Sequence, residues 1–213
     1  MGNNVLSTYL SIKMKRYALF DFDGTITTKD TLFDFIRFTY GTSGLIKCIS
    51  MNMWNLFLYA TKLRCNEKAK ERLLSTMLKG KNCRIFEEEC TRYSLERIPK
   101  IINEETKRII DKHKASNDTL IIVSASPEDW IKPWAKENGF TSVIATRLEK
   151  KNGLLTGKFA SRNCYGKEKV NRIKEVLVKR ESVYISAYGD SLGDKPMLDY
   201  ANQGILIKKA QQK

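Results

Sequence analysis

The stretch YALFDFDGT, residues 17–25, carries the clearest structural signal in this sequence. Apolar residues run directly into two carboxylates and a glycine, a pattern typical of a buried parallel strand that ends at a loop. Residues two positions apart on a strand point to the same side, so Asp21 and Asp23 can converge on one ligand. Because open α/β sheets bind ligands at the carboxyl ends of their strands, the stretch predicts a site there.

The chemistry of these two side chains indicates a cation. Two carboxylates this close repel each other unless a positive charge lies between them, and oxygen ligands suit a hard ion such as Mg²⁺. Gly24 allows the backbone to approach a ligand, and the N–H groups of such a turn can cradle an anion. The alternative is an ordinary surface Asp-x-Asp-Gly turn, which this stretch alone does not exclude.

Three later segments extend the pattern along the chain. The apolar run 120–123 ends at Ser124-Ala125-Ser126, and the run 183–188 ends at Gly189 and is followed by Asp190 and Asp194. Between them, Lys167 and Lys169 open a helical pattern. This order of strand-end Asp pair, strand-end Ser, helix-borne Lys and strand-end Asp pair resembles the haloacid dehalogenase superfamily of phosphotransferases.

The periodicity and the resemblance together predict an α/β fold, a Rossmann-like parallel sheet core with an inserted all-helical cap. Apolar runs predict core strands at about 16–20, 119–124, 142–145, 183–187 and 204–207, with helices between them. The catalytic core is expected at 15–29 and 98–213, the cap at 30–97, and an irregular extension at 1–14. A helical insertion at this place resembles the phosphoserine phosphatase-like branch.

The resemblance implies roles for the acids. Asp21 would be the nucleophile that forms an aspartyl-phosphate, and Asp23 would protonate the leaving oxygen and then activate water. Dehalogenating members lack the second Asp, so Asp23 favours a phosphatase. Mg²⁺ would be held by an Asp21 oxygen, the backbone carbonyl of Asp23 and Asp190, while Asp194 would bind the metal or orient its ligands.

The resemblance also implies a phosphate-binding set. The Ser124 hydroxyl, the Ala125 N–H and the turn at Gly24 would contact phosphoryl oxygens, and a lysine would neutralise their charge. Lys169 is preferred to Lys167 for that role, because Lys169 begins the family's lysine-then-apolar helix register.

Asp30 is a possible substrate contact. In phosphoserine phosphatases the matching acid is Glu, which receives the substrate's ammonium group, and the shorter Asp weakens the case for phosphoserine. The alternative interpretation is that Asp30 caps a helix beginning at Thr31.

Composition limits the remaining choices. The chain has 213 residues, a formal net charge of +14, five cysteines and a single histidine. A His-based triad or zinc site is excluded, and His113 is predicted to be solvated. Scattered cysteines and no secretory signal favour reduced thiols in the cytoplasm. The basic residues are spread along the chain, which favours a solvated surface over nucleic-acid binding.

Three local patterns give further expectations. Residues 44–63 are notably apolar and predict a helix buried in the cap, with an amphipathic patch on an anionic membrane as the competing interpretation. Ser126 and Pro127 predict the start of a helix, with Ser126 as its cap. Asn152-Gly153 predicts the turn of a hairpin.

The leading functional hypothesis is a Mg²⁺-dependent phosphomonoester hydrolase acting on a small phosphorylated metabolite such as phosphoserine or a related compound. A membrane-peripheral lipid phosphatase, similar to phosphatidylglycerophosphate phosphatases, is the alternative. A non-catalytic basic binding protein is a third hypothesis, which the complete set of acids disfavours.

Overall fold

A parallel five-stranded sheet forms the centre of the computed structural model, which describes residues 14–61, 66–177 and 183–207. The strand order is β3-β2-β1-β6-β7, and each neighbouring pair is parallel. The strands are β1 (Lys15–Phe20), β2 (Thr119–Pro127), β3 (Ser142–Thr146), β6 (Val183–Gly189) and β7 (Gln203–Leu206). The predicted α/β fold and all five core strands are confirmed, whereas the predicted extension lies outside the described residues except for Met14.

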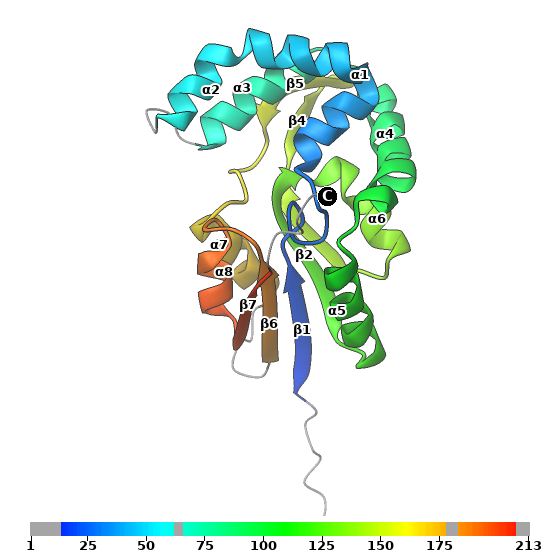
Figure 1. Ribbon diagram of the computed structural model, residues 1–213, viewed down its shortest axis with the longest axis vertical. Helices are drawn as coiled ribbons and strands as arrows, with labels where there is room; N and C mark the ends of the chain where they lie inside the picture. The colour runs from blue at the N-terminus through cyan, green and yellow to red at the C-terminus, as the bar shows by residue number, and fades with distance from the viewer. Residues whose placement is uncertain (1–13, 62–65, 178–182, 208–213) are drawn as a thin grey trace, which may run out of the picture.

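Helices cover both faces of this sheet (Figure 1). One face carries α5 (Glu104–Ala115) and α6 (Lys132–Glu137), and the other carries α7 (Lys167–Val176) and α8 (Lys195–Tyr200). Alternate residues of β1 serve the two layers: Phe20 packs in the same cluster as Ile110 of α5, and Leu19 packs with Ile173 of α7. Burial on both faces explains why the strand sequences are continuously apolar.

A group of helices between β1 and β2 lies above the carboxyl ends of the strands (Figure 1). It consists of α1 (Thr31–Met51), α2 (Met53–Ala60), α3 (Asn66–Leu78), α4 (Cys83–Arg92), the π-helical turn η1 (Tyr93–Arg97) and the 3₁₀ turn η2 (Ile98–Ile101). Helix α1 is broken at Gly41, whose φ of 73° and ψ of 179° are not helical. We propose that residues 30–97 act as a cap over the core.

The two segments that connect cap and core run side by side. Thr28 N donates to Ile101 O at 2.8 Å, and Asn103 N donates to Ile26 O at 2.8 Å. Within the cap, the guanidinium of Arg97 donates twice to the Asp34 carboxylate, both at 2.8 Å. Because such a bidentate pair fixes orientation as well as distance, it ties the start of α1 to the end of the helical group.

The predicted hairpin is confirmed. Strands β4 (Leu148–Lys151) and β5 (Leu154–Phe159) are antiparallel and turn at Asn152 and Gly153, whose φ angles are 50° and 75°. The hairpin lies against the cap, because Gly80 N donates to Leu155 O at 2.8 Å and Cys83 N donates to Gly153 O at 2.8 Å. A segment that follows β3 in the sequence therefore supports the helices inserted after β1.

Two local predictions were wrong. Strand β2 continues to Pro127 and a 3₁₀ turn, η3 (Glu128–Trp130), follows, so Ser126 caps no helix. The side chain of His113 is only 11% exposed: its Nδ1 lies 2.6 Å from Asp118 Oδ2 and its Nε2 lies 2.7 Å from the Tyr188 hydroxyl. The histidine is largely covered because the end of α5 packs over the sheet, which its charged helical sequence did not indicate.

The prediction that the apolar segment 44–63 is buried was also wrong for several of its described residues, which are exposed. The exposed fractions are 62% for Ile46, 68% for Met53, 71% for Trp54 and 52% for Phe57. The structure places these side chains on the outside, while Asn52, which caps the end of α1, and Asn55 of α2 face inward and are 2% and 7% exposed. Among the described residues, no helix is both long and apolar enough to cross a membrane.

Candidate active site

A cavity of about 700 Å³ lies where the strand ends meet the cap. Most residues predicted for the site line it, namely Asp21, Asp23, Gly24, Asp30, Ala125, Lys169, Asp190 and Asp194. Ser124 is fully buried. Side chains that are far apart in the sequence are thus brought to one place by the parallel sheet, as expected at the carboxyl edge of such a sheet.

Asp21 lies at the centre of the cavity floor, immediately after β1. Its backbone N–H donates to Tyr188 O at 2.9 Å, which holds the residue against the end of β6. The residue is only 6% exposed, and this burial raises the pKa of its carboxyl to about 7, although nearby Lys169 opposes the increase. A buried carboxyl group with a shifted pKa, next to a cation in a cavity, is a candidate catalytic group.

Lys169 is the lysine that the structure brings into the site. Its Nζ donates to Asp21 Oδ1 at 2.6 Å, to Asp194 Oδ1 at 2.5 Å and to Val123 O at 2.8 Å, so all three ammonium protons are used. Burial alone would lower the pKa of Lys169, but the two carboxylates raise it overall. Lys167, at the first position of α7, is exposed.

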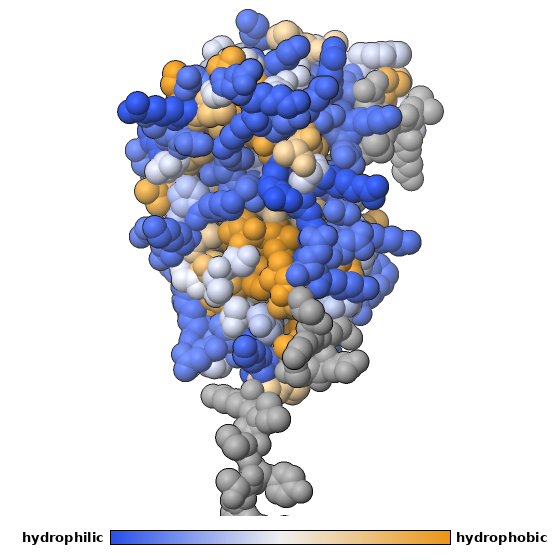
Figure 2. All heavy atoms as spheres, turned by 180° about the vertical axis from the view of Figure 1, so that it is seen from behind, coloured by the Kyte–Doolittle hydropathy of each residue, from blue (hydrophilic) through white to orange (hydrophobic). Residues whose placement is uncertain are grey.

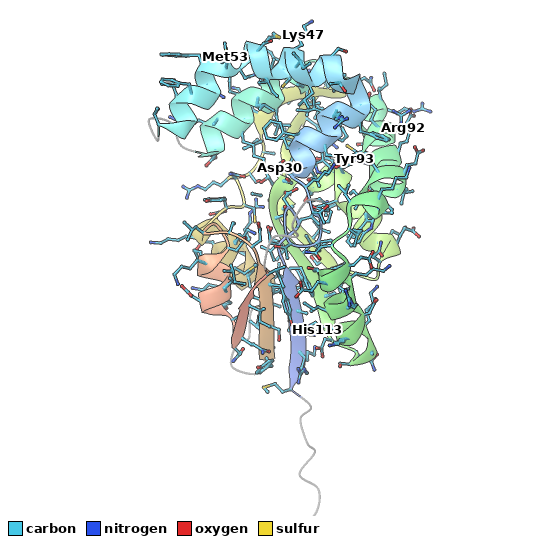
Figure 3. The ribbon with its side chains drawn as sticks, in the orientation of Figure 1. Asp30, Lys47, Met53, Arg92, Tyr93 and His113 are labelled. Carbon is cyan, nitrogen blue, oxygen red and sulfur yellow. The ribbon has the colours of Figure 1, made fainter. Side chains whose placement is uncertain are left out.

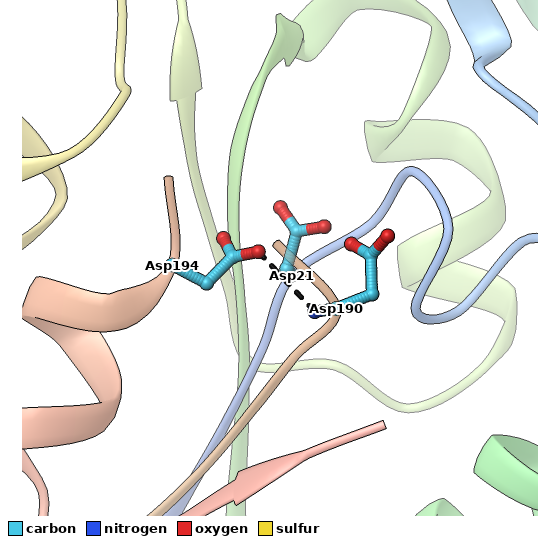
Figure 4. A group of neighbouring side chains, drawn as sticks. All are labelled: Asp21, Asp190 and Asp194. Atoms are coloured by element: carbon cyan, nitrogen blue, oxygen red, sulfur yellow. Dashed lines mark hydrogen bonds between the residues drawn. The ribbon is translucent and has the colours of Figure 1, made fainter. Parts of the chain in front are cut away.

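The carboxylates of Asp21, Asp190 and Asp194 form a cluster whose oxygens lie within 4.8 Å of one another (Figure 4). The Oδ2 of Asp194 accepts hydrogen bonds from the backbone N–H groups of Asp190 and Ser191 and from the Ser191 hydroxyl, while its Oδ1 accepts from Lys169. Because both oxygens of Asp194 accept hydrogen bonds, its carboxylate is fixed. It can therefore hold Lys169 and the backbone of Asp190 in position.

The glycine of the first motif is required by its surroundings. Gly24 has a φ of 83°, and a Cβ atom built on it would lie 2.4 Å from Asp190 Oδ2. The turn after β1 and the carboxylate of Asp190 are therefore in close contact, and any side chain at residue 24 would displace that carboxylate.

Asp23 is held separately from that cluster, by two residues that the sequence analysis did not assign to the site. The N–H and hydroxyl of Thr31 donate to its Oδ1 at 2.7 and 2.5 Å, and the hydroxyl of Ser126 donates to its Oδ2 at 2.5 Å. Trp130 Nε1 in turn donates to the Thr31 hydroxyl at 3.1 Å. Ser126 followed a strand end in the sequence, a signal that the assignment as a helix cap obscured.

The carboxyl-terminal part of β2 provides another part of the cavity wall. Ala125 lines the cavity, whereas the Ser124 hydroxyl accepts a hydrogen bond from Ser126 N at 3.0 Å. A cap residue also reaches this wall: Lys70 Nζ, from α3, donates to Ala125 O at 3.0 Å. Lys70 and Arg37 line the cavity from the cap, and the sequence offered no motif that would have identified them.

Asp30 lies at the mouth, between core and cap (Figure 3). Its carboxylate accepts from Leu32 N at 2.9 Å and caps α1, so the alternative drawn from the sequence is what the structure shows. Although its side chain reaches solvent, the surrounding protein and then the neighbouring Asp23 raise the pKa of this carboxyl. Asp30 thus both starts the first cap helix and faces the cavity.

Comparison with known proteins agrees with this geometry. The family model described as haloacid dehalogenase-like hydrolase matches residues 18–199. Protein CicA of Caulobacter vibrioides is 29% identical over 185 residues, which cover 86% of this chain and 82% of CicA. A Mycobacterium tuberculosis protein named as a probable phosphatase is 30% identical over 134 residues, covering 55% of this chain and 46% of that protein.

A solved structure shares the fold. The structure of a phosphoserine phosphatase that carries a phospho-aspartyl intermediate analogue aligns with a TM-score of 0.60 at 23% identity, over 92% of this chain and 87% of the other. The similarity shows that the two chains share a fold.

Proposed function

Because the chain belongs to the haloacid dehalogenase-like hydrolase family, we propose that it is a phosphatase that hydrolyses a small phosphate monoester. The proposal depends on one observation: two acids on the same turn lie in different surroundings, which suit them to different roles. Asp21 is buried and paired with Lys169, while Asp23 is held by two hydroxyl groups at the cavity wall.

In the first step Asp21 would attack the phosphorus atom of the substrate. A bond forms between a carboxylate oxygen and phosphorus, and the bond from phosphorus to the ester oxygen breaks. Asp23 donates a proton to the departing oxygen, so that an alcohol leaves. The contact between Lys169 and Asp21 favours the ionised carboxylate that this attack requires.

In the second step Asp23 would act in the opposite direction. Now ionised, it accepts a proton from water, and the water oxygen attacks phosphorus to release inorganic phosphate and restore Asp21. The hydrogen bonds from Thr31 and Ser126 hold the Asp23 carboxylate in one orientation through both steps. Because Thr31 belongs to the cap and Ser126 to the core, the position of Asp23 depends on the contact between them.

The residues present fit a Mg²⁺ ion. The cluster of Asp21, Asp190 and Asp194 offers only oxygen ligands, which a hard divalent ion prefers, and its negative charges exceed the single charge of Lys169. We propose that Asp21, Asp190 and the backbone carbonyl of Asp23 hold the ion, with Asp194 orienting them. When bound, the ion would supply positive charge to the phosphoryl oxygens.

The phosphoryl oxygens would be bound by the chain's own donors. Lys169 offers charge beside Asp21, and the backbone at Gly24 and Ala125 lines the cavity. We propose that Lys169 neutralises part of the charge of the transferred group, and that the backbone at Gly24 and Ala125 and the Ser124 hydroxyl donate hydrogen bonds to it. Beyond them, Asp30 and Arg37 line the cavity with opposite charges, which suits a substrate that also carries an ammonium or a carboxylate group.

The test is phosphate release from a panel containing phosphoserine, sugar phosphates, nucleotides and phosphatidylglycerophosphate, with Mg²⁺ or with EDTA. We expect metal-dependent release, lost by at least about a thousandfold in Asp21→Asn. Lys167→Met, which changes an exposed charge near the site, is the matched control and should retain activity. Full activity of Asp21→Asn would contradict the proposed nucleophile.

The lipid phosphatase remains a second candidate because of one observation. The outer helices of the cap expose apolar side chains, which a phosphatase of soluble metabolites does not need. Preference for phosphatidylglycerophosphate over the soluble members of the panel would select this candidate.

A further inference from the structure

We propose that the outer corner of the cap is a surface that docks on an anionic membrane, whatever the substrate proves to be. We call it the outer cap face and define it by exposed side chains of α1 and α2, namely Ile46, Ile49, Met51, Met53, Trp54 and Phe57. The inference goes beyond the proposed chemistry, because it concerns where the protein works and uses none of the catalytic residues.

The first observation is the extent of exposure. Trp54 is 71% exposed, Met53 68% and Met51 63%. Large apolar side chains such as these gain the most free energy when they are removed from water. Trp54 and Phe57 stack on each other, with ring centroids 5.5 Å apart, so the two rings form one apolar ridge. Figure 2 shows apolar side chains between hydrophilic ones at the top of the molecule, the end that α1 and α2 form.

The second observation is that helix α2 is oriented opposite to an ordinary surface helix. Asn52 and Asn55 face the protein: Asn52 Nδ2 donates to Cys48 O at 2.9 Å and to Thr76 Oγ1 at 3.1 Å, and Asn55 Nδ2 donates to Ala69 O at 3.0 Å. These bonds turn Asn52, at the end of α1, and Asn55, in α2, toward α3, while Met53, Trp54 and Phe57 are exposed. A helix that buries Asn55 and exposes Met53, Trp54 and Phe57 is matched to apolar surroundings.

The third observation is charge. From Phe35 to Asn66 the sequence contains no Asp or Glu, although the chain as a whole has 24 of them. Lys47 is exposed beside Ile46 and lies, like Met53, on the side of the cap away from Asp30 (Figure 3). An acid-free apolar surface with a lysine at its margin, on a chain of net charge +14, complements anionic headgroups.

Charge also favours a membrane over a second copy of the chain. A symmetric dimer through this face would bring two copies of +14 together and place the same lysine-bearing surface on both sides. A bilayer with anionic lipids instead offers opposite charge, and Trp54 is the kind of side chain that concentrates at the boundary between headgroups and acyl chains. Since no described helix is suited to span a bilayer, the contact would be peripheral.

Docking there would leave the active site accessible. Leu45 of α1 lines the catalytic cavity, whereas its neighbour Ile46 belongs to the outer cap face. Helix α1 would therefore lie between the membrane and the cavity, with residues that face each of them. A bound membrane would position the cap without covering Asp21.

The experiment uses the full chain and vesicles of phosphatidylglycerol and phosphatidylcholine. We expect co-sedimentation with the anionic vesicles, weaker binding to pure phosphatidylcholine, and binding at least about tenfold weaker in the triple variant Met53→Ser, Trp54→Ser, Phe57→Ser. The matched control is Ile85→Ser, Leu95→Ser, which changes exposed apolar residues of α4 and η1 and should bind like the unmodified protein. Fluorescence gives a second measure, because Trp130 and Trp134 are buried and brominated lipids should quench mainly Trp54.

The outcomes separate this inference from the proposed function. Phosphate release from soluble substrates should be unchanged in the triple variant, so a loss of vesicle binding alone supports the docking surface. Equal binding by the triple variant and the control would overturn it. Self-association of the unmodified protein without vesicles, abolished in the triple variant and accompanied by no lipid binding, would identify a second copy as the occupant and overturn it as well.

Discussion

The floor of the active site and the outer cap face both reverse the usual distribution of polar and apolar groups, but in different ways. At the floor, Asp21, Asp194 and Lys169 are charged and almost fully buried. At the outer cap face, large apolar side chains are exposed while Asn52 and Asn55 are buried. The buried charges find their partners within the chain, whereas the exposed apolar groups face outward.

This difference separates two kinds of function. A buried ion pair needs its partners at fixed distances, so the site is self-contained and loses stability when one partner is removed. Exposed apolar side chains contribute little to folding and become useful only against another surface. The two regions should therefore respond in opposite ways to substitution, and the expectations below are arranged from the largest effect to the smallest.

The strongest test of the buried region is Lys169→Met. It leaves the carboxylates of Asp21 and Asp194 facing each other without their cation, so in EDTA we expect the free energy of unfolding to fall by about 3–5 kcal/mol. Urea unfolding measures the change, and Lys167→Met should be neutral because residue 167 is exposed. Equal stabilities of the two variants would show that the buried charges are not interdependent.

A second test concerns the close approach of the first turn to Asp190. In Gly24→Ala the added methyl would meet Asp190 and the backbone would remain at a φ of 83°, so we expect Mg²⁺ affinity to fall at least about tenfold and stability by about 1–3 kcal/mol. Gly153→Ala is the matched control, because φ there is 75° but no atom lies within 4 Å of the new methyl group. It should lose stability and keep its metal affinity, as measured by calorimetry.

A third test uses the raised pKa of Asp21. With that pKa at about 7 in the metal-free protein, the carboxyl carries a proton at lower pH, and Mg²⁺ must displace it. Affinity for Mg²⁺ should therefore fall about tenfold for each pH unit below 7 and change little above it. Calorimetry at pH 8 and pH 6 measures this, and His113→Gln shows whether the only histidine contributes. A pH-independent affinity would contradict the role of Asp21 as a ligand.

The smallest effect is expected at the outer cap face. Trp54→Ser with Phe57→Ser should change the free energy of unfolding by no more than about 0.5 kcal/mol, because both side chains are exposed. Phe35→Ala, which removes a buried ring stacked on Trp130, should instead cost about 3–5 kcal/mol. A large loss from the exposed pair would mean that these residues stabilise the cap, and would weaken the contrast between the two regions.

Local sequence patterns were sufficient for the sheet and for most of the site. The predicted core strands, the hairpin at Asn152-Gly153 and the order of the strand-end motifs all agree with the structure. These features depend on neighbouring residues, since continuous apolar runs form buried strands and an Asn-Gly pair adopts the left-handed turn. Parallel strands then bring their carboxyl ends together, so Asp21 and Asp190 could be placed in one site in advance.

Contacts between distant segments decided the rest. The sequence favoured Lys169 over Lys167, but only the packing of α7 against β2 buries it beside Asp21. Asp23 accepts hydrogen bonds from Thr31 and Ser126, which lie in two distant segments. In the sequence, these two residues indicated only a helix start and a helix cap.

The outer cap face is a second feature that the sequence alone could not determine. The apolar composition of residues 44–63 was evident from the sequence alone, yet composition does not state which side of a helix faces the protein. The bonds of Asn52, at the end of α1, to Thr76 and of Asn55, in α2, to Ala69 determine which side faces α3. Strand positions and the order of the motifs follow from neighbouring residues along the chain, whereas strand order in the sheet, burial and helix rotation are determined by partners that only the folded chain brings together.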